Sequence, residues 1–206
     1  MAERRYGAPA PATDSTVTGA DWDGRDISGE QHTRVLFVDL DFTEGTNNGA
    51  VFTDCTFRRA KFNSSSHTDA AFVNCTFQNC TFFETRFTEC KFVGSMFDRC
   101  TFDIMSVSGG NWSFVGLPGA DLRKATFAGV RLREADLTGA NFDGGKIRDS
   151  DMSGASLHAA KLTDCDLRGS DVSSIEPAHT DLRGAIVTYS QALAIANSLG
   201  LDMRDE

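Results

Sequence analysis

The chain has 206 residues, a length typical of one domain, so separate catalytic and cofactor domains are not expected. Lys and Arg total 20 against 29 Asp and Glu, which gives a formal net charge of -9. Because a surface of that sign repels phosphates, direct binding to nucleic acid is disfavoured. Phe accounts for 16 residues while Tyr and Trp number two each, so the sequence selects Phe by shape as well as by hydrophobicity.

The first 18 residues hold two of the four prolines together with Ala, Ser and Thr, and almost no large apolar side chain. This composition predicts a flexible tail over residues 1–18. No stretch of the chain approaches the roughly 18 consecutive apolar residues of a membrane span, and the N-terminus has no apolar core of a signal peptide. We therefore expect no membrane association and a cytoplasmic location.

A five-residue period dominates the rest of the sequence. Steps of five from Trp22 to Val187 give 34 positions, here called central positions, and 30 of them carry a large apolar side chain. Fourteen of the 16 Phe and both Trp fall on this register. The exceptions are His32, Asn47, His67 and Pro177. The register never slips, so residues 19–189 are expected to form one repeat region.

The residue two before each central position is small in 29 of 34 cases, and the other three places are mostly polar. A period of five fits neither the 3.6 of a helix nor the 2 of a simple strand. The unit is therefore expected to be a short extended piece followed by a corner. Because one such unit cannot bury its apolar side alone, stacking of successive coils is required, as in other solenoids.

Units such as ADLRK at 120–124, ANFDG at 140–144 and CDLRG at 165–169 resemble those of pentapeptide-repeat proteins. The resemblance implies an all-β solenoid: a right-handed quadrilateral β-helix with four units, or 20 residues, in each coil. The repeat region would then make about 8.5 coils, in a rod of about 40 Å at the usual strand spacing. Clustered glycines between residues 109 and 119 suggest a slight bend or narrowing of the rod there.

All six cysteines occupy the small position two before a central residue, where a thiol packs as a small apolar group. Cys55 and Cys75 would stack on adjacent coils, as would Cys80 and Cys100, but parallel stacked side chains disfavour a disulfide. No spacing typical of a zinc site is present, so neither a metal nor a cofactor is expected. His158 and His179 are expected to be neighbouring surface residues.

Asn47 and His67 take central positions 20 residues apart, within the segments EGTNNG and SSSHTD. The favoured interpretation is that two relaxed turns bulge there and leave the polar groups partly hydrated. The alternative is that these two side chains contact a partner.

After Val187 the period stops, and residues 190–206 are expected to form a C-terminal helical cap. The segment from Ser190 to Leu199 reads as a short helix with Ser190 as its N-cap and Gly200 as its terminator. A solenoid end exposes an apolar cross-section, which the helix either covers in a monomer or uses to join two rods about a twofold axis. The dimer interface would comprise Leu193, Ile195, Ala196, Leu199, Leu201 and Met203.

The uninterrupted repeat and the closing segment LRGAIVTYSQALAIANSLGL narrow the resemblance to fluoroquinolone-resistance proteins of the Qnr and MfpA type, and within these to the mycobacterial branch without loops. This likeness implies a homodimer that acts on DNA gyrase. Two rods of 40 Å joined end to end would carry -18 formal charges over roughly 80 Å, about two fifths of the charge density of duplex DNA. Such a rod would imitate the sign and outline of DNA, and a basic groove shaped for DNA would attract it.

Acidic residues near the expected dimer centre are the candidate gyrase contacts. They are Asp136, Asp151, Asp166, Asp171, Glu176 and Asp181. The alternative is that Asp before a central residue belongs to the repeat pattern and binds the corners of the coil. The leading hypothesis is a DNA mimic that modulates gyrase or protects it from quinolones or another poison. The alternative is a structural scaffold for another basic protein; an enzyme is not expected, because no acid, base and nucleophile converge.

Overall fold

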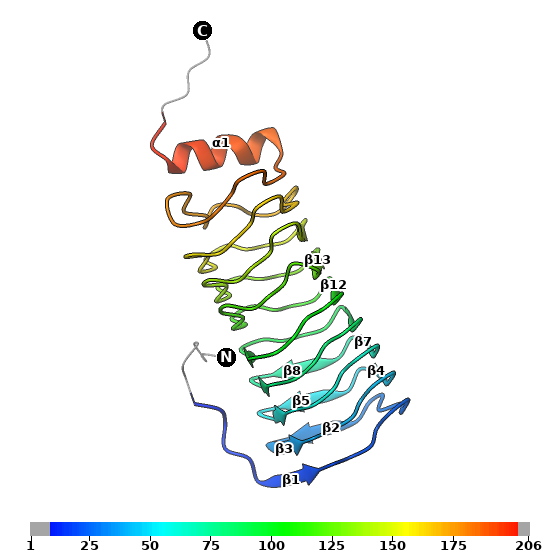
Figure 1. The fold of residues 1–206 in the computed structure, drawn as a ribbon. Helices are drawn as coiled ribbons and strands as arrows, with labels where there is room; N and C mark the ends of the chain where they lie inside the picture. The colour runs from blue at the N-terminus through cyan, green and yellow to red at the C-terminus, as the bar shows by residue number, and fades with distance from the viewer. Residues whose placement is uncertain (1–8, 202–206) are drawn as a thin grey trace.

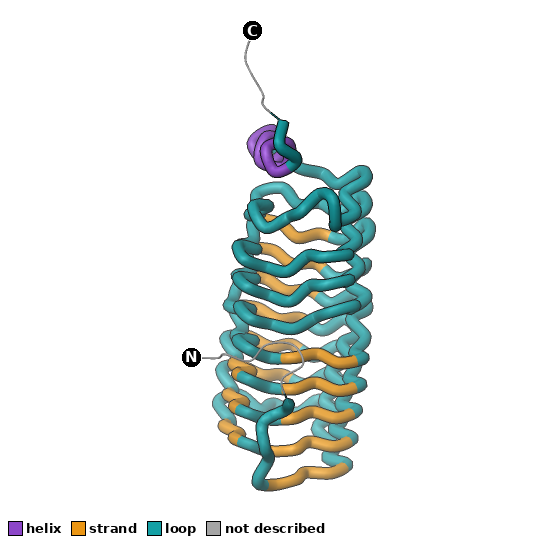
Figure 2. The backbone as a smooth tube through the Cα atoms, turned by 90° about the vertical axis from the view of Figure 1, so that its left-hand side faces the viewer, coloured by secondary structure: helices purple, strands orange, loops and turns teal. Residues whose placement is uncertain are grey.

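The computed structural model describes residues 9–201, which form a right-handed all-β solenoid closed at one end by a helix (Figure 1). Residues 1–8 and 202–206 lie outside the described part, and with them the predicted interface residue Met203. The coils stack along one axis, and the helix lies across the last of them (Figures 1 and 2). The expected fold class is therefore confirmed.

Backbone pairing joins each residue to the one 20 positions later, in parallel register. One column of pairs takes eight such steps from Asp26 to Ile186, close to the expected 8.5 coils. A typical step is the pair of hydrogen bonds from Trp22 N to Asp41 O, 2.7 Å, and from Asp41 N to Ala20 O, 3.0 Å. Because every coil uses the same offset, four columns of residues run along the rod as four faces.

Each face is defined here by its central residues. Face 1 runs from Val17 in steps of 20, face 2 from Trp22, face 3 from Ile27 and face 4 from His32. Face 1 carries the sheet β1 (Ser15–Thr18), β3 (Val35–Val38), β6 (Thr56–Arg58), β9 (Thr76–Gln78) and β11 (Met96–Asp98). Face 3 carries β4 (Thr46–Asn48), β7 (Ser66–Thr68), β10 (Arg86–Thr88), β12 (Ser106–Ser108), β13 (Thr126–Ala128) and β14 (Lys146–Arg148). Face 4 carries β2 (Gln31–Thr33), β5 (Val51–Thr53) and β8 (Ala71–Val73), while among the described residues face 2 is held by isolated bridges alone.

The core is a ladder of central side chains, nearly all of them buried. On face 1 the rings of Phe37, Phe57, Phe77 and Phe97 stack at centroid distances of 5.0, 4.9 and 4.6 Å, with interplanar angles of at most 8°. These distances match the spacing of paired strands, so a flat ring fills the height of one coil. This match explains why the sequence selects Phe by shape.

The corners require a left-handed backbone at the last residue of most units. Eighteen non-glycine residues and 15 glycines have positive φ among the described residues. The left-handed region is unfavourable for a residue with a Cβ, and Gly, Asn and Asp enter it most easily. The polar and glycine-rich character of this place in the repeat thus has a backbone cause.

Strand β1 (Ser15–Thr18) pairs with β3, so the first coil begins at about residue 15 rather than 19. The expected tail boundary was therefore wrong by four residues. Val17 continues the five-residue register one unit before Trp22 and packs against the core. Its neighbours Thr16 and Thr18 are exposed and polar, which explains why composition alone assigned them to the tail.

The expected bulge at Asn47 and His67 was also wrong, because both side chains are buried and in register within β4 and β7. Asn47 Nδ2 lies 3.1 Å from His67 Nδ1, His67 Nε2 lies 3.0 Å from Ser65 Oγ, and Asn47 Oδ1 accepts from Ala50 N at 3.0 Å. The imidazole also stacks on Phe87 at 4.8 Å. The two polar residues satisfy each other inside the core, so neither needs a bulge, water or a partner.

Helix α1 (Tyr189–Ser198) begins two residues earlier than the sequence suggested. Its N-cap is Thr188 rather than Ser190, because Gln191 completes a capping box with Thr188. Gly200 follows the helix with φ of +78°, as expected of a terminator. The buried Gln191 Nε2 donates to Leu167 O and Ser170 O, both at 2.7 Å. This pair of hydrogen bonds anchors the helix to the last coil.

Candidate protein-binding surface

The six candidate gyrase contacts do not form one patch, because they lie on four different faces. Asp136 and Glu176 are on face 1, Asp151 and Asp171 on face 4, Asp166 on face 3 and Asp181 on face 2. Asp151 and Asp171 share one column of the rod, and Asp136 and Glu176 share another. A partner that approaches from one side can therefore reach two or three of the six.

The five aspartates of this set also bind corners of the coil. Each accepts a hydrogen bond through Oδ1 from the amide two residues later, at distances from 2.8 Å at Asp171 to 3.3 Å at Asp181. Arg168 clamps Asp166 with two bonds of 2.9 and 2.8 Å, and this pairing lowers the pKa of the carboxyl to about 2. Arg183 similarly lowers the pKa of Asp181 to about 2. The alternative role, in which these aspartates bind corners of the coil, is thus present. Arginines also neutralise much of the negative charge of the set.

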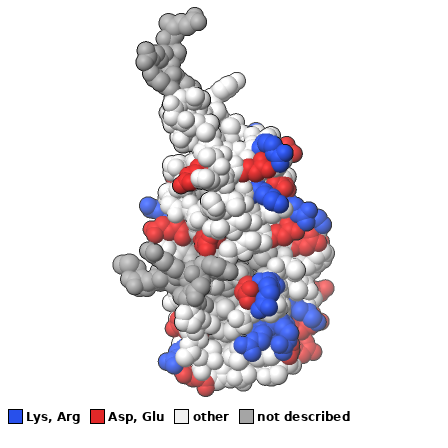
Figure 3. All heavy atoms as spheres, turned by 60° about the vertical axis from the view of Figure 1, so that its left-hand side comes forward, with Lys and Arg blue, Asp and Glu red and all other residues white. Residues whose placement is uncertain are grey.

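The distribution of charge differs between the two ends of the rod. Residues 120–187 hold 11 acidic and nine basic side chains, a net of -2, whereas residues 14–119 hold 14 and eight, a net of -6. Figure 3 shows acidic and basic side chains interspersed on one side of the rod. The negative field is therefore strongest away from the C-terminal helix.

One face accounts for most of this excess. On face 2, residues 20–104 hold six acidic side chains and one lysine, a net of -5; we call this set the acidic face. Its acids are Asp21, Asp23, Asp41, Glu44, Glu84 and Asp103. Lys61 pairs with Asp41 at 2.8 Å and Asp103 with Lys124 at 3.0 Å. The remaining four acids have no ion pair within the described residues, so their field is open to a partner.

The sequence reasoning missed the acidic face, although the signal was present. Sorting the charged residues by their place in the 20-residue coil separates face 2 from the other three faces. Over residues 20–119 those faces have small balances, +1 on face 1, -1 on face 3 and 0 on face 4. At the spacing of paired strands, the acidic face spans about 20 Å, so its density is about one net charge per 4 Å, against one per 1.7 Å in DNA.

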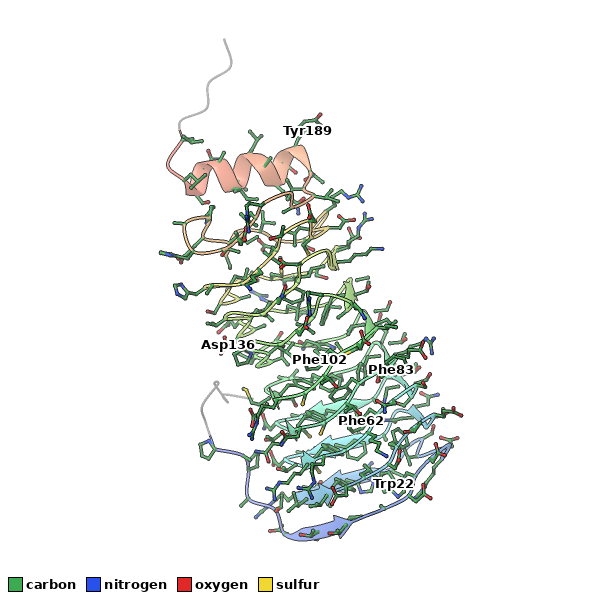
Figure 4. The ribbon with its side chains drawn as sticks, in the orientation of Figure 1. Trp22, Phe62, Phe83, Phe102, Asp136 and Tyr189 are labelled. Carbon is green, nitrogen blue, oxygen red and sulfur yellow. The ribbon has the colours of Figure 1, made fainter. Side chains whose placement is uncertain are left out.

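The predicted dimer residues on helix α1 and beyond it differ in exposure. Leu193 is 51% exposed, Leu199 56% and Leu201 57%, while Ile195 and Ala196 are half-buried against the coil. Tyr189 projects from the helix away from the rod and is 95% exposed (Figure 4). The end of the rod therefore presents several large side chains whose apolar surface the chain itself leaves uncovered.

The cysteines are free, and five of the six are buried. Thiols donate to backbone carbonyls of the preceding coil, as in Cys80 Sγ to Phe57 O at 3.4 Å. Burial raises the pKa of the Cys90 thiol to about 11 and that of Cys165 to about 12, so both remain protonated at neutral pH. His158 and His179 are exposed neighbours with ring centroids 5.2 Å apart, as expected.

Over residues 9–201 no group of three potential ligand side chains forms a metal site. The described part also contains no helix that is long and apolar enough to cross a bilayer.

Comparisons with solved structures give the same architecture. A trypsin-treated variant of QnrB1, a plasmid-mediated fluoroquinolone resistance protein, shares 22% identity with a TM-score of 0.61, over 94% of this chain and 100% of that one. HetL from the cyanobacterium Nostoc sp., a protein involved in regulation of heterocyst differentiation, shares 17% identity with a TM-score of 0.62, over 90% of each chain. These two proteins have different roles, so the likeness shows the fold alone. No curated protein matches the sequence.

Two family profiles match the sequence directly. The pentapeptide repeat region profile matches residues 50–127, and the profile of eight pentapeptide repeats matches residues 117–154 and 135–173. Together they cover residues 50–173, more than half of the chain. The 20-residue coil, the Phe and Leu ladder and these matches agree, and the chain belongs to the pentapeptide-repeat proteins.

Proposed function

We propose that this protein works by binding a basic protein surface, and that its partner is DNA gyrase, which it modulates or protects from quinolones or another poison. The observation that carries the proposal is the acidic face, a stripe of net charge -5 along one side of the rod. A basic groove that accepts duplex DNA would attract such a stripe over long range. The proposal assigns recognition and no catalysis to the protein, and it requires a cytoplasmic location.

The first test is a supercoiling assay in which the purified protein is titrated into DNA gyrase, with and without ciprofloxacin. We expect altered supercoiling or relief of drug inhibition, weakened as salt concentration rises because the contact is electrostatic. Unchanged gyrase activity at micromolar protein, both with and without the drug, would overturn the gyrase proposal.

Aspartates near the C-terminal end remain candidate contacts, and they can be tested without disturbing the fold. Asp151→Asn and Asp171→Asn remove the charge but keep the oxygen that accepts from Ser153 N and Ser173 N. If the two aspartates touch gyrase, the double variant weakens the effect while its thermal unfolding stays close to that of the parent. Unaltered activity would remove them from the contact surface.

We also propose that two rods join through helix α1 and the residues just after it, with Leu193, Ile195, Ala196, Leu199 and Leu201 in the interface and Met203 as a sixth, untested contact. The exposure of the three leucines supports this assignment. Replacing Leu193 and Leu199 with Asp should convert the dimer to a monomer in sedimentation analysis. An unchanged sedimentation coefficient for the double variant would refute the dimer.

A scaffold for a different basic protein is the second candidate function. The near balance of charge over residues 120–187 favours it, because a mimic centred on the C-terminal end would need more negative charge there than a net of -2. Salt-dependent binding to a basic partner without any effect on gyrase would select this function.

A further inference from the structure

The ladder of backbone pairs is interrupted at one place on face 2. Thr81 pairs with Thr101 and Asp121 with Asn141, but within the described chain no bridge joins Thr101 to Asp121. One coil earlier, Phe82 N donates to Thr101 O and Glu84 N to Asp103 O, both at 2.9 Å. The corresponding amides of residues 102 and 104 make no such bond to the next coil. Two successive coils therefore lose their backbone pairing on face 2, and we call this place the interrupted rung.

The interruption is confined to one face. Across the same step, face 1 keeps the bridge from Met96 to Gly116, face 3 pairs β12 with β13, and face 4 keeps the bridge from Asn111 to Arg131. Because the other three faces keep a bridge across this step, the two coils part on one side only, close to the clustered glycines that suggested a bend in the sequence. Unpaired strand-edge amides at such an opening are available to another backbone.

A groove of 640 Å³ lies at the opening. Its walls include Phe83, Phe102, Asp103, Asp121 and Arg123. Phe83 is 42% exposed, because it stands at the outward place after the buried central residue Phe82, where the neighbouring coils carry the polar Asn63 and Asp103 (Figure 4). The groove thus combines an exposed aromatic wall with free backbone donors, and its volume falls within the usual range of ligand sites.

Ile104, next to the groove, is 49% exposed and has φ of +59°. A β-branched residue in the left-handed region is a marked outlier, and here burial does not compensate for the strain. Glycine stands at the same corner two coils later, at Gly144, with φ of +67°. An exposed Phe, an exposed and strained Ile and an interrupted ladder at one place all reduce stability, and a ligand that covers them would offset the loss.

Charge around the groove defines the occupant. Inside it, Arg123 pairs with Asp121 at 2.6 Å and Lys124 with Asp103 at 3.0 Å, so the floor is nearly neutral. On the N-terminal side lie Glu84 and the rest of the acidic face. A segment that entered the groove and continued over this side would meet negative charge along its length.

We propose that this groove binds an extended segment of a basic partner protein, with an apolar side chain against Phe83 and Ile104, backbone pairing to the free amides, and flanking Lys or Arg side chains over the acidic face. Strand addition of this kind takes its affinity from main-chain bonds and its selectivity from side-chain pockets. The inference rests on the proposed function for its basic partner, and it adds where on the rod that partner attaches.

The direct test uses labelled twelve-residue peptides and the full chain. One peptide has alternating Lys and Gly with a central Leu, a second replaces this Leu with Gly, and a third replaces Lys with Glu. We expect fluorescence anisotropy to show at least tenfold tighter binding of the first peptide than of either other. Phe83→Ser should weaken that binding about tenfold, whereas Ile186→Ser, at a residue that is similarly exposed on another face, should leave it unchanged.

A matched pair of charge variants tests the acidic face. Glu44→Lys with Glu84→Lys and the control Asp69→Lys with Glu134→Lys each change the net charge by +4, and all four residues occupy corners with φ between 51° and 54°. Only the first pair should reduce binding of the first peptide. Equal losses in both pairs would reveal nonspecific attraction and overturn the proposal, as would equal binding of all three peptides.

Hydrogen exchange separates strand addition from loose adsorption. Saturating peptide should slow exchange at the amides of Phe102 and Ile104 and leave that of Val107, already paired on face 3, unchanged. Unchanged exchange at both groove amides would overturn backbone pairing.

The same variants distinguish this inference from the gyrase proposal. Suppose that the parent acts on gyrase and that both the Phe83→Ser variant and the Glu44→Lys/Glu84→Lys variant act on it equally well. The groove proposal is then wrong and the gyrase proposal stands. If gyrase is unaffected by the parent but the peptide binds in a Phe83-dependent way, the gyrase proposal fails and the groove stands.

Discussion

The two halves of the rod follow the same backbone path with different interiors. We call residues 14–119 the phenylalanine half and residues 120–187 the leucine half. Twelve of the 14 described strands lie in the first and only β13 and β14 in the second, where isolated bridges replace them. The pairing offset of 20 residues is nevertheless the same in both. The corners and the inter-coil hydrogen bonds therefore set the coil, and the identity of the central side chain tunes how extended each side is.

The halves also differ in what they offer a partner. The phenylalanine half carries a net charge of -6, concentrated on one face, and ends at the interrupted rung, while the leucine half is nearly balanced and ends in an exposed helix. In the two proposals above, the first half would attach the partner and the end of the second half would join two rods.

The strongest test of the comparison removes one central side chain from each half on the same face. Phe77→Ala should destabilise the rod by about 4 kcal/mol and Leu137→Ala by about 3 kcal/mol, because both leave a cavity but only Phe77 loses two stacked neighbours. Phe77→Leu keeps most of the volume and should still lose about 1 kcal/mol. Urea denaturation followed by circular dichroism measures all three, and a neutral Phe77→Leu would show that ring stacking adds nothing to burial.

The second test concerns pH, because the phenylalanine half alone buries a histidine. Burial lowers the pKa of His67 to about 3, whereas an unfolded histidine titrates near 6.5. Between these values the unfolded state binds the extra proton, so stability falls as pH falls from 6.5 towards 3, by up to about 1.4 kcal/mol per pH unit. The lowered carboxyl pKa values of Asp166 and Asp181 act in the same direction only below about pH 4.

His67→Phe isolates this contribution. The variant also loses the contact with Asn47, which lowers its stability at every pH, so the informative quantity is the slope of stability against pH between 6.5 and 4.5. We expect that slope to fall to near zero. A slope equal to that of the parent would mean that groups other than His67 cause the dependence.

The fold was predictable from the sequence because the repeat imposes one physical constraint at every fifth residue. Central positions such as Phe37 and Leu137 can only point inwards, and this fixed the register and the place of the terminal helix, whereas the 20-residue coil followed from the resemblance to pentapeptide-repeat proteins. The structure differs from the prediction where a local sequence pattern suggested a turn but the residues lie in register within the stacked coils. Asn47 and His67 looked like turn residues, but each supplied the hydrogen-bonding partner that the other needed inside the core.

The binding surface was predictable only in part. The candidate aspartates were chosen by proximity to the expected dimer centre, whereas Asp166 and its equivalents are largely occupied by corner amides and arginines. The acidic face could have been found by sorting charges into four columns. The groove could not, because nothing in the sequence between Thr101 and Asp121 breaks the five-residue register while the backbone pairing does break.

The third test weakens the closure of the leucine half. Gln191→Ala removes the two bonds from Nε2 that hold helix α1 on the last coil and leaves the carbonyls of Leu167 and Ser170 without that donor. We expect a loss of about 2 kcal/mol, because buried polar groups without a partner are unfavourable. Hydrogen exchange should accelerate in α1 and the last coil and stay unchanged in β6 and β9, and Asn197→Ala on the exposed side of the helix should have no comparable effect. Uniform acceleration along the rod would contradict independent halves.

The smallest expected effect lies at the boundary between the halves. Ile104→Asn should stabilise the protein by about 0.5–1 kcal/mol, because asparagine tolerates the left-handed backbone better than a β-branched residue and little burial is lost from a side chain that is 49% exposed. Thermal unfolding measures the gain, and Glu84→Asn, at the preceding corner of the same column with φ of +52°, is the control that should change stability less.

Function should move in the opposite direction. If the strain at Ile104 is retained because its side chain forms part of the groove, the stabilised Ile104→Asn variant binds the Lys and Leu peptide more weakly than the parent does. A variant that is more stable and binds equally well would show that Ile104 does not contribute to the groove, leaving Phe83 as its apolar wall. A variant that is less stable would instead show that packing of Ile104 outweighs the backbone strain, and the phenylalanine half would then extend through the interrupted rung without a weak point.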